Sequence, residues 1–182
     1  MPILGVIASS RQTAVADLGA YYPLQVISVG ASGASSVTFS NIPSTYSHLQ
    51  IRVLMRTQTS QDSFIRFNGD TNANYSFHFL VGNGDVTASG GFANNTSIGW
   101  KTVSGTADIF TVAVVDILDY ANTNKFKTTR SFAGDDLNGS GALVLHSGNW
   151  RNTNAITSIT MSTASTSFSQ FSQFALYGVK SA

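Results

Sequence analysis

The fold is decided by residues 109–132, which read IFTVAVVDILDYANTNKFKTTRSF. From Ile109 to Leu118, β-branched and apolar residues occupy both odd and even positions, which is the pattern of a strand covered on both faces. Asp119 to Asn124 supplies Asx residues, which tolerate left-handed backbone angles and cap their own turn. We therefore expect a central strand that reverses into a second strand, and we expect this hairpin to organise the fold.

The second strand of the hairpin, residues 125–132, has an alternating pattern. Phe126 and Phe132 share one parity, which predicts the face that joins the core. Lys127 has the other parity, which predicts exposure to solvent. The strand should thus be half buried.

Similar short strands recur along the chain, separated by turn-forming residues. The clearest is Leu49 to Thr57, where Leu49, Ile51, Val53 and Met55 alternate with mostly polar residues and predict a core face. The segment from Gly82 to Trp100 is rich in Gly and Asn and is expected to be a flexible connection. About eight to ten strands with frequent turns predict an all-β fold, an antiparallel two-sheet sandwich that is jelly-roll-like. The expected strands are 24–29, 36–39, 49–57, 64–67, 75–81, 109–118, 125–132, 142–146, 156–161 and 168–179.

Composition limits the classes of function. The 182 residues suit one domain, and 10% charged residues is well below the roughly 25% of an average soluble domain. Lys and Arg number 10 against 9 Asp and Glu, so no basic field favours nucleic acid. The longest apolar run, 109–118, is shorter than the roughly 20 residues of a membrane span, so we expect no membrane role. Cys is absent, which excludes disulfides and thiolate metal sites.

Residues 1–20 lack strand alternation and carry an apolar cluster of Ile3, Leu4, Val6 and Ile7. Exposed apolar clusters usually mark contacts, so we expect an N-terminal attachment arm that docks on a partner. A disordered terminus is the alternative. Residues 21–182 then form the sandwich domain.

The sequence offers little support for catalysis or a cofactor. The three His residues fall in no metal-ligand spacing, and no Gly-x-Ser-x-Gly motif occurs. Asp70 to Asn74 places oxygen side chains at alternate positions, as a calcium loop does, but Tyr75 stands where Gly is expected and Val81 where a bidentate Glu is needed. We expect an Asx-rich turn there, no bound metal, and a protein that is not an enzyme.

Aromatic and amide residues near predicted loops are the candidates for surface contacts. Trp100 and Trp150, with Asn94 and Asn95 nearby in sequence, have the chemistry to stack on a sugar ring and hydrogen-bond its hydroxyls. Core packing or packing between subunits explains the two Trp residues equally well.

Segments spread over nearly the full length form a distinctive set of strands and turns. They are residues 3–10, 42–52, 66–70, 74–76, 116–125, 150–158 and 174–180. With these segments the chain resembles a group of small virion proteins of tailed bacteriophages, which act as capsid decoration or tail-fibre-like modules. The resemblance implies a β-sandwich on a phage particle and no catalytic residue.

Two functions follow from this resemblance. The first is a capsid decoration, or cement, protein on the particle exterior, anchored by its arm to the major capsid protein or another virion protein. The second is a tail-fibre or tail-tip module that binds a host surface glycan. Either protein is located in the virion after assembly in the host cytoplasm. The absence of a predicted coiled-coil shaft favours decoration. Low surface charge and many aromatics favour a homo-oligomer, and the three-fold sites used by phage exterior modules make it a homotrimer.

Overall fold

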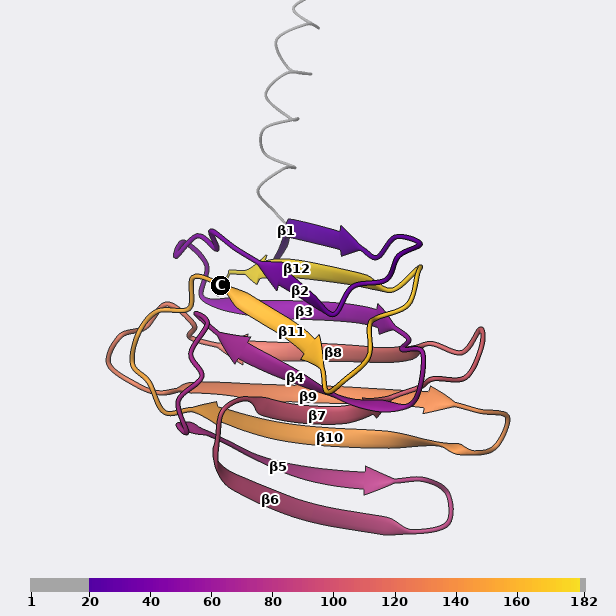
Figure 1. The fold of residues 1–182 in the computed structure, drawn as a ribbon. Helices are drawn as coiled ribbons and strands as arrows, with labels where there is room; N and C mark the ends of the chain where they lie inside the picture. The colour runs from indigo at the N-terminus through magenta and orange to yellow at the C-terminus, as the bar shows by residue number, and fades with distance from the viewer. Residues whose placement is uncertain (1–19, 181–182) are drawn as a thin grey trace, which may run out of the picture.

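A computed structural model describes residues 20–180, with the side chains of residues 100–102 excepted. In this part of the chain all regular structure is β, and the strands form two antiparallel sheets packed face to face (Figure 1). The predicted all-β two-sheet sandwich is therefore confirmed.

Twelve strands make up the described fold. Their bounds are β1 (Tyr21–Ser28), β2 (Ser36–Phe39), β3 (His48–Met55), β4 (Gln61–Phe67), β5 (Tyr75–Gly82), β6 (Thr87–Asn95), β7 (Ile98–Val103), β8 (Thr111–Leu118), β9 (Lys127–Asp136), β10 (Gly141–Trp150), β11 (Ile159–Thr163) and β12 (Gln173–Val179).

The two sheets differ in size. The larger has eight strands in the order β1-β12-β3-β8-β9-β10-β5-β6, and the smaller has four in the order β2-β11-β4-β7. The edge strand β7 of the smaller sheet contacts β10 and β5. Figure 1 shows β5 and β6 extending below β7, at the bottom of the view. The larger sheet therefore projects beyond the smaller one on this side, and we call this projection the overhang.

The core lies between the two sheets. Leu49, Ile51, Val53 and Met55 of β3 are all buried, as their alternation predicts. They pack in one cluster with apolar residues of the smaller sheet, among them Ile65 of β4. Burying each such side chain is worth about 1.5–3 kcal/mol, so this inner face supplies most of the stability.

The central hairpin forms as predicted, because β8 lies between β3 and β9 in the larger sheet. The expectation that β8 is covered on both faces is wrong. Ala113, Val115 and Ile117 are buried, but Val112 and Leu118 are 54% and 43% exposed. Only the inner face of the larger sheet is covered by the smaller one, so the even positions of β8 face outward.

The predicted orientation of the second strand of the hairpin is also wrong. Phe126 and Phe132 are each 51% exposed, whereas Lys127 is fully buried. The alternation along β9 is real, since Lys127, Thr129 and Ser131 all face inward. β9 therefore turns its more polar face toward the core, whereas hydrophobicity favours the face that carries Phe132.

Hydrogen bonds explain how the core accepts Lys127. Its Nζ donates to the carbonyl oxygens of Asn122 at 2.5 Å, Lys125 at 2.9 Å and Thr153 at 3.0 Å. These carbonyls use the three donors of the ammonium group and replace its water shell. Burial lowers the pKa of Lys127, and the positive charge of Lys125 lowers it further. The ammonium group thereby ties the β8–β9 turn to the segment that follows β10.

The segment from Gly82 to Trp100 is not the flexible connection that the sequence favours, because it contains β6 and the start of β7. Gly90 of β6 lies directly opposite Phe79 of β5. A Cβ atom at Gly90 would lie 2.7 Å from the Phe79 ring. Glycine is thus required here because the aromatic ring of the neighbouring strand lies over its backbone.

The predicted arm, with Ile3, Leu4, Val6 and Ile7, lies outside the described residues except for Ala20. The Ala20 carbonyl accepts a hydrogen bond of 3.1 Å from the Lys180 backbone N–H. Both ends of the described chain therefore meet at β1 and β12. Within residues 20–180 there is no helix of the length and apolarity needed to cross a membrane.

Adjacent residues of β3 test which face of the larger sheet is the core. Met55→Ala should lower the free energy of unfolding by about 2–5 kcal/mol, because Met55 is fully buried. Leu54→Ala is the matched control and should cost less than about 1 kcal/mol, because Leu54 faces outward and is 41% exposed. Denaturant unfolding measures both. Equal losses in the two variants would contradict the assigned faces.

Candidate functional site

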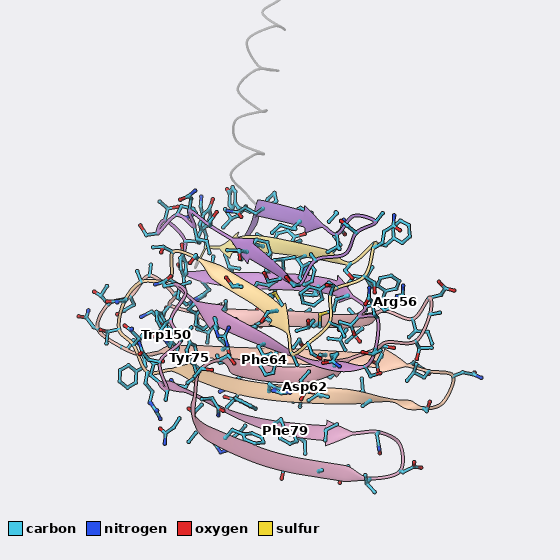
Figure 2. The ribbon with its side chains drawn as sticks, in the orientation of Figure 1. Arg56, Asp62, Phe64, Tyr75, Phe79 and Trp150 are labelled. Carbon is cyan, nitrogen blue, oxygen red and sulfur yellow. The ribbon has the colours of Figure 1, made fainter. Side chains whose placement is uncertain are left out.

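An open cavity of about 470 Å³ lies where the overhang meets the smaller sheet. Residues of both sheets line it. Phe77, Phe79 and His146 come from the larger sheet, and Asp62 and Phe64 come from β4 of the smaller sheet. Figure 2 shows Asp62 and Phe64 on β4 and Phe79 below them on the overhang. The cavity exists because β7 ends the smaller sheet, so no further strand covers this part of β5 and β6.

Four rings from three neighbouring strands form the aromatic floor of the cavity. The centroid of Phe92 lies 5.0 Å from that of Phe77 and 6.3 Å from that of Phe79. The centroid of His146 lies 6.1 Å from Phe77 and 5.9 Å from Phe79. Neighbouring ring planes differ by only 19° to 30°. The floor therefore offers broad, nearly parallel ring faces, and Phe92 remains half exposed.

His146 is uncharged at neutral pH. Burial lowers its pKa to about 4, although a hydrogen bond with the Gly99 backbone opposes the shift. Its Nδ1 is buried and has no hydrogen-bond partner, so the hydrogen bond to Gly99 belongs to Nε2. The ring thus donates through Nε2 and keeps Nδ1 as an acceptor.

Polar groups line the other side of the cavity. Asp62 is exposed, Asn95 is partly buried, and Ser97 is buried. A Cβ atom at Gly99 would lie 2.8 Å from the Phe77 ring, so glycine lets this ring settle against β7. The combination of apolar rings with a few hydrogen-bonding groups is typical of small-molecule binding sites.

The prediction that Trp150 is a surface contact is wrong. Trp150 ends β10 and is only 1% exposed. Its ring stacks on Tyr75 at 6.2 Å and 18°, and it lies 5.6 Å from the ring of Phe67. Its Nε1 donates a hydrogen bond of 2.8 Å to the Asp70 carboxylate. This hydrogen bond joins the buried indole to the Asp70 turn, and Figure 2 shows Trp150 beside Tyr75.

The Asp70 to Asn74 segment forms the expected Asx-rich turn. Oδ1 of Asp70 accepts hydrogen bonds from the Asn72 backbone at 2.9 Å and the Asn72 side chain at 2.8 Å, and Oδ2 accepts from the Asn74 side chain at 2.8 Å. Burial alone would raise the pKa of Asp70, but the hydrogen bonds from Asn74, Asn72 and Trp150 outweigh it and lower this pKa to about 2. The carboxylate is occupied by protein donors.

The other predicted contact residues separate in space. Asn94 is exposed, and its Oδ1 accepts a hydrogen bond of 2.8 Å from Arg151. Asn95 lines the cavity. Trp100 belongs to β7 by its backbone, opposite Ser63, but its side chain is outside the described ones. Of the four candidates, Asn95 alone is placed at the cavity by the described contacts.

The histidines have separate roles. Nδ1 of His48 accepts a hydrogen bond of 3.0 Å from the Asp119 backbone, which fixes the start of the β8–β9 turn. His78 is exposed on the outer side of β5, whereas His146 lies in the cavity. Among residues 20–180, no group of three or more His, Cys, Asp or Glu side chains is placed to hold a metal ion.

Most residues of the cavity floor escaped sequence reasoning. Tyr75, Phe77 and Phe79 alternate along the predicted strand 75–81, which is typical of a core face, but of the three only Tyr75 is fully buried. The signal that was available is Gly90, near Phe92, because a glycine in a strand often marks a close approach, here of the Phe79 ring. Nothing in the sequence pairs His146 with these residues.

Comparison with known proteins does not identify a family. No protein-family model matches the sequence, and no curated protein matches it. The resemblance to phage virion proteins therefore stays a prediction.

The Asp70 turn gives a test that depends on pH. Asp70→Asn should lower the free energy of unfolding at pH 7 by about 1–3 kcal/mol, because the buried Trp150 N–H loses a charged acceptor. The folded pKa of about 2 lies below the usual 3.8, so the carboxylate stabilises the fold above about pH 4 and this contribution is lost toward pH 2. The variant should therefore lose less stability than the wild type over that interval.

The matched control is Asp85→Asn, in the exposed β5–β6 turn. It should change stability by less than about 0.5 kcal/mol. Urea unfolding at several pH values measures all three proteins. Parallel pH profiles for the wild type and Asp70→Asn would contradict the assigned network.

Proposed function

We propose that this chain is a structural protein of a tailed-phage particle, a decoration protein attached to the capsid exterior. The observation that supports the proposal is the apolar outward surface of the larger sheet. We call this surface the outer face, and it is defined by six exposed side chains, Leu54, Leu80, Val112, Phe132, Leu143 and Leu145.

The register of the sheet makes the outer face continuous. One row across the strands joins Leu54 to Val112 and reaches Leu143 through Gly134. The next row joins Val114 of β8 to Phe132, Leu145 and Leu80 in turn. Phe132, Leu145 and Leu80 are each 51–52% exposed. Apolar side chains in adjacent rows form a contiguous patch, and large patches of this kind mark interaction sites.

Charged residues border the patch. In the row beyond Leu145, Asp116 of β8 lies opposite Arg130 of β9 in the register, so both signs of charge stand at one margin. Nε2–H of Gln50 donates to the Asp116 carboxylate at 2.9 Å. The outer face is also hollowed at two places, one of them between His78 and Arg130. An apolar centre with a polar margin is the usual anatomy of a protein interface.

The outer face is large enough for a stable complex. The whole outward side of the larger sheet, which includes the outer face and its polar surroundings, measures roughly 900 Å² for eight strands about 4.8 Å apart, each of about eight residues at 3.4 Å. A standard protein interface buries about 800 Å² on each partner. The face thus suits a virion protein such as the major capsid protein, or neighbouring copies in the homotrimer that we also propose.

The arm completes this proposal. Ile3, Leu4, Val6 and Ile7 anchor the module to the particle or to a neighbouring subunit, and several arms on one oligomer add avidity. The described chain begins at β1, an edge strand of the larger sheet, so we expect the arm at one edge of the sheet that carries the outer face.

A charge placed within the patch tests the outer face. Leu145→Glu should fold normally, because Leu145 is half exposed, but it should reduce occupancy on particles of the encoding phage at least about tenfold. Ser36→Glu, on an exposed position of β2, is the matched control and should bind as the wild type does. Quantitative gel analysis of purified particles measures occupancy, and circular dichroism verifies folding. Normal occupancy of Leu145→Glu would exclude the outer face as the attachment surface.

A further inference from the structure

The aromatic cavity and the outer face lie on opposite sides of the larger sheet. Phe79 of β5 points into the cavity, and its neighbour Leu80 belongs to the outer face. Successive side chains of a strand point to opposite faces, so a partner on the outer face does not cover the cavity. A subunit attached through the outer face would keep the cavity accessible.

The floor of the cavity selects ligands with a flat apolar face. Phe77, Phe79, Phe92 and His146 lie side by side with nearly parallel planes. His146 is uncharged at neutral pH and adds a fourth ring to the surface. Ring faces of this kind attract C–H groups that lie flat against them.

The polar side of the cavity selects ligands that carry hydroxyl groups. The Asp62 carboxylate has about four lone-pair sites, enough to accept from adjacent hydroxyls while keeping a contact with the protein. The Asn95 amide both donates and accepts, and the Ser97 hydroxyl does the same. The described lining includes one carboxylate and no Lys or Arg, so it disfavours an anionic ligand.

We propose that this cavity binds a neutral saccharide. The apolar C–H face of a pyranose ring lies on Phe77, Phe79 and Phe92, and its hydroxyls reach Asp62 and Asn95. The volume of about 470 Å³ is within the range of about 300–1,000 Å³ for small-ligand pockets and accepts a mono- or disaccharide unit. This binding activity is independent of the proposed attachment to a capsid.

The first experiment uses defined probes with the full chain. The neutral probes are the methyl glycosides of glucose, galactose, mannose and rhamnose. Methyl glucuronide is the anionic counterpart, and N-acetyltryptophanamide represents an aromatic side chain of a peptide. Saturation-transfer NMR should detect binding of at least one neutral glycoside with a Kd of about 1 mM, a usual strength for a single small site. Methyl glucuronide should bind at least about tenfold more weakly.

Variants then locate the site. Phe79→Ala and Asp62→Ala should each weaken binding of the neutral glycoside about tenfold or more, since one removes a ring of the floor and the other the carboxylate. Leu80→Ala is the matched control, because it truncates the adjacent side chain on the opposite face and should leave binding unchanged. Asp62 is exposed, so Asp62→Ala stays informative if Phe79→Ala proves unstable. Thermal unfolding of each variant verifies the fold.

Three results would overturn the inference. The first is no binding of any neutral glycoside at about 20 mM, some twentyfold above the expected Kd. The second is equal binding of the glycoside by the variants Asp62→Ala, Phe79→Ala and Leu80→Ala. The third is binding of N-acetyltryptophanamide alone. The last result would make the cavity a pocket for an aromatic side chain. Loss of particle attachment in Leu145→Glu with intact saccharide binding would leave the inference standing, so the two proposals fail separately.

Discussion

The packing of a four-stranded sheet on an eight-stranded sheet is the constraint on which the rest of the structure depends. The smaller sheet covers only one side of the larger one and ends at β7, which contacts β5 but leaves part of β5 and β6 uncovered. The first fact leaves Val112, Phe132 and Leu145 exposed on the other side. The second leaves Phe77 and Phe79 as walls of a cavity instead of a closed core. Both candidate binding surfaces thus follow from the unequal size of the sheets.

The sequence predicts strands well because their period is local, but it does not predict which face of a strand is inward. In β3 one parity is entirely apolar and the other is polar except for Leu54, so its core face was predicted correctly. In β8 both parities carry apolar residues, and in β9 the more polar parity faces inward, so the choice of face depends on partners distant in sequence. Lys127 is buried because carbonyls of Asn122, Lys125 and Thr153 converge on its Nζ, and that convergence exists only in the folded chain. Phe132 is consequently outside.

The candidate site was harder to predict than the fold. Trp150 looked like a loop aromatic, but Asp70, 80 positions away in the sequence, accepts its indole N–H inside the protein. The floor of the cavity joins Phe77 and Phe79 to Phe92 and His146 from flanking strands, and this juxtaposition depends on strand order. Strand order is set by long-range pairing, which local periodicity does not encode. Asn95 was found because amides near turns are reasonable contact candidates.

An attachment surface on one side of the larger sheet and a cavity on the other would suit either a decoration protein or a tail-tip module. The number of copies on a particle distinguishes these two functions most directly. Quantitative mass spectrometry of purified virions measures the ratio of this chain to the major capsid protein. Our account predicts a copy number comparable with the number of capsid subunits or a simple fraction of it. A handful of copies per virion would indicate a tail module, and complete absence from the particle would contradict a structural role in the virion.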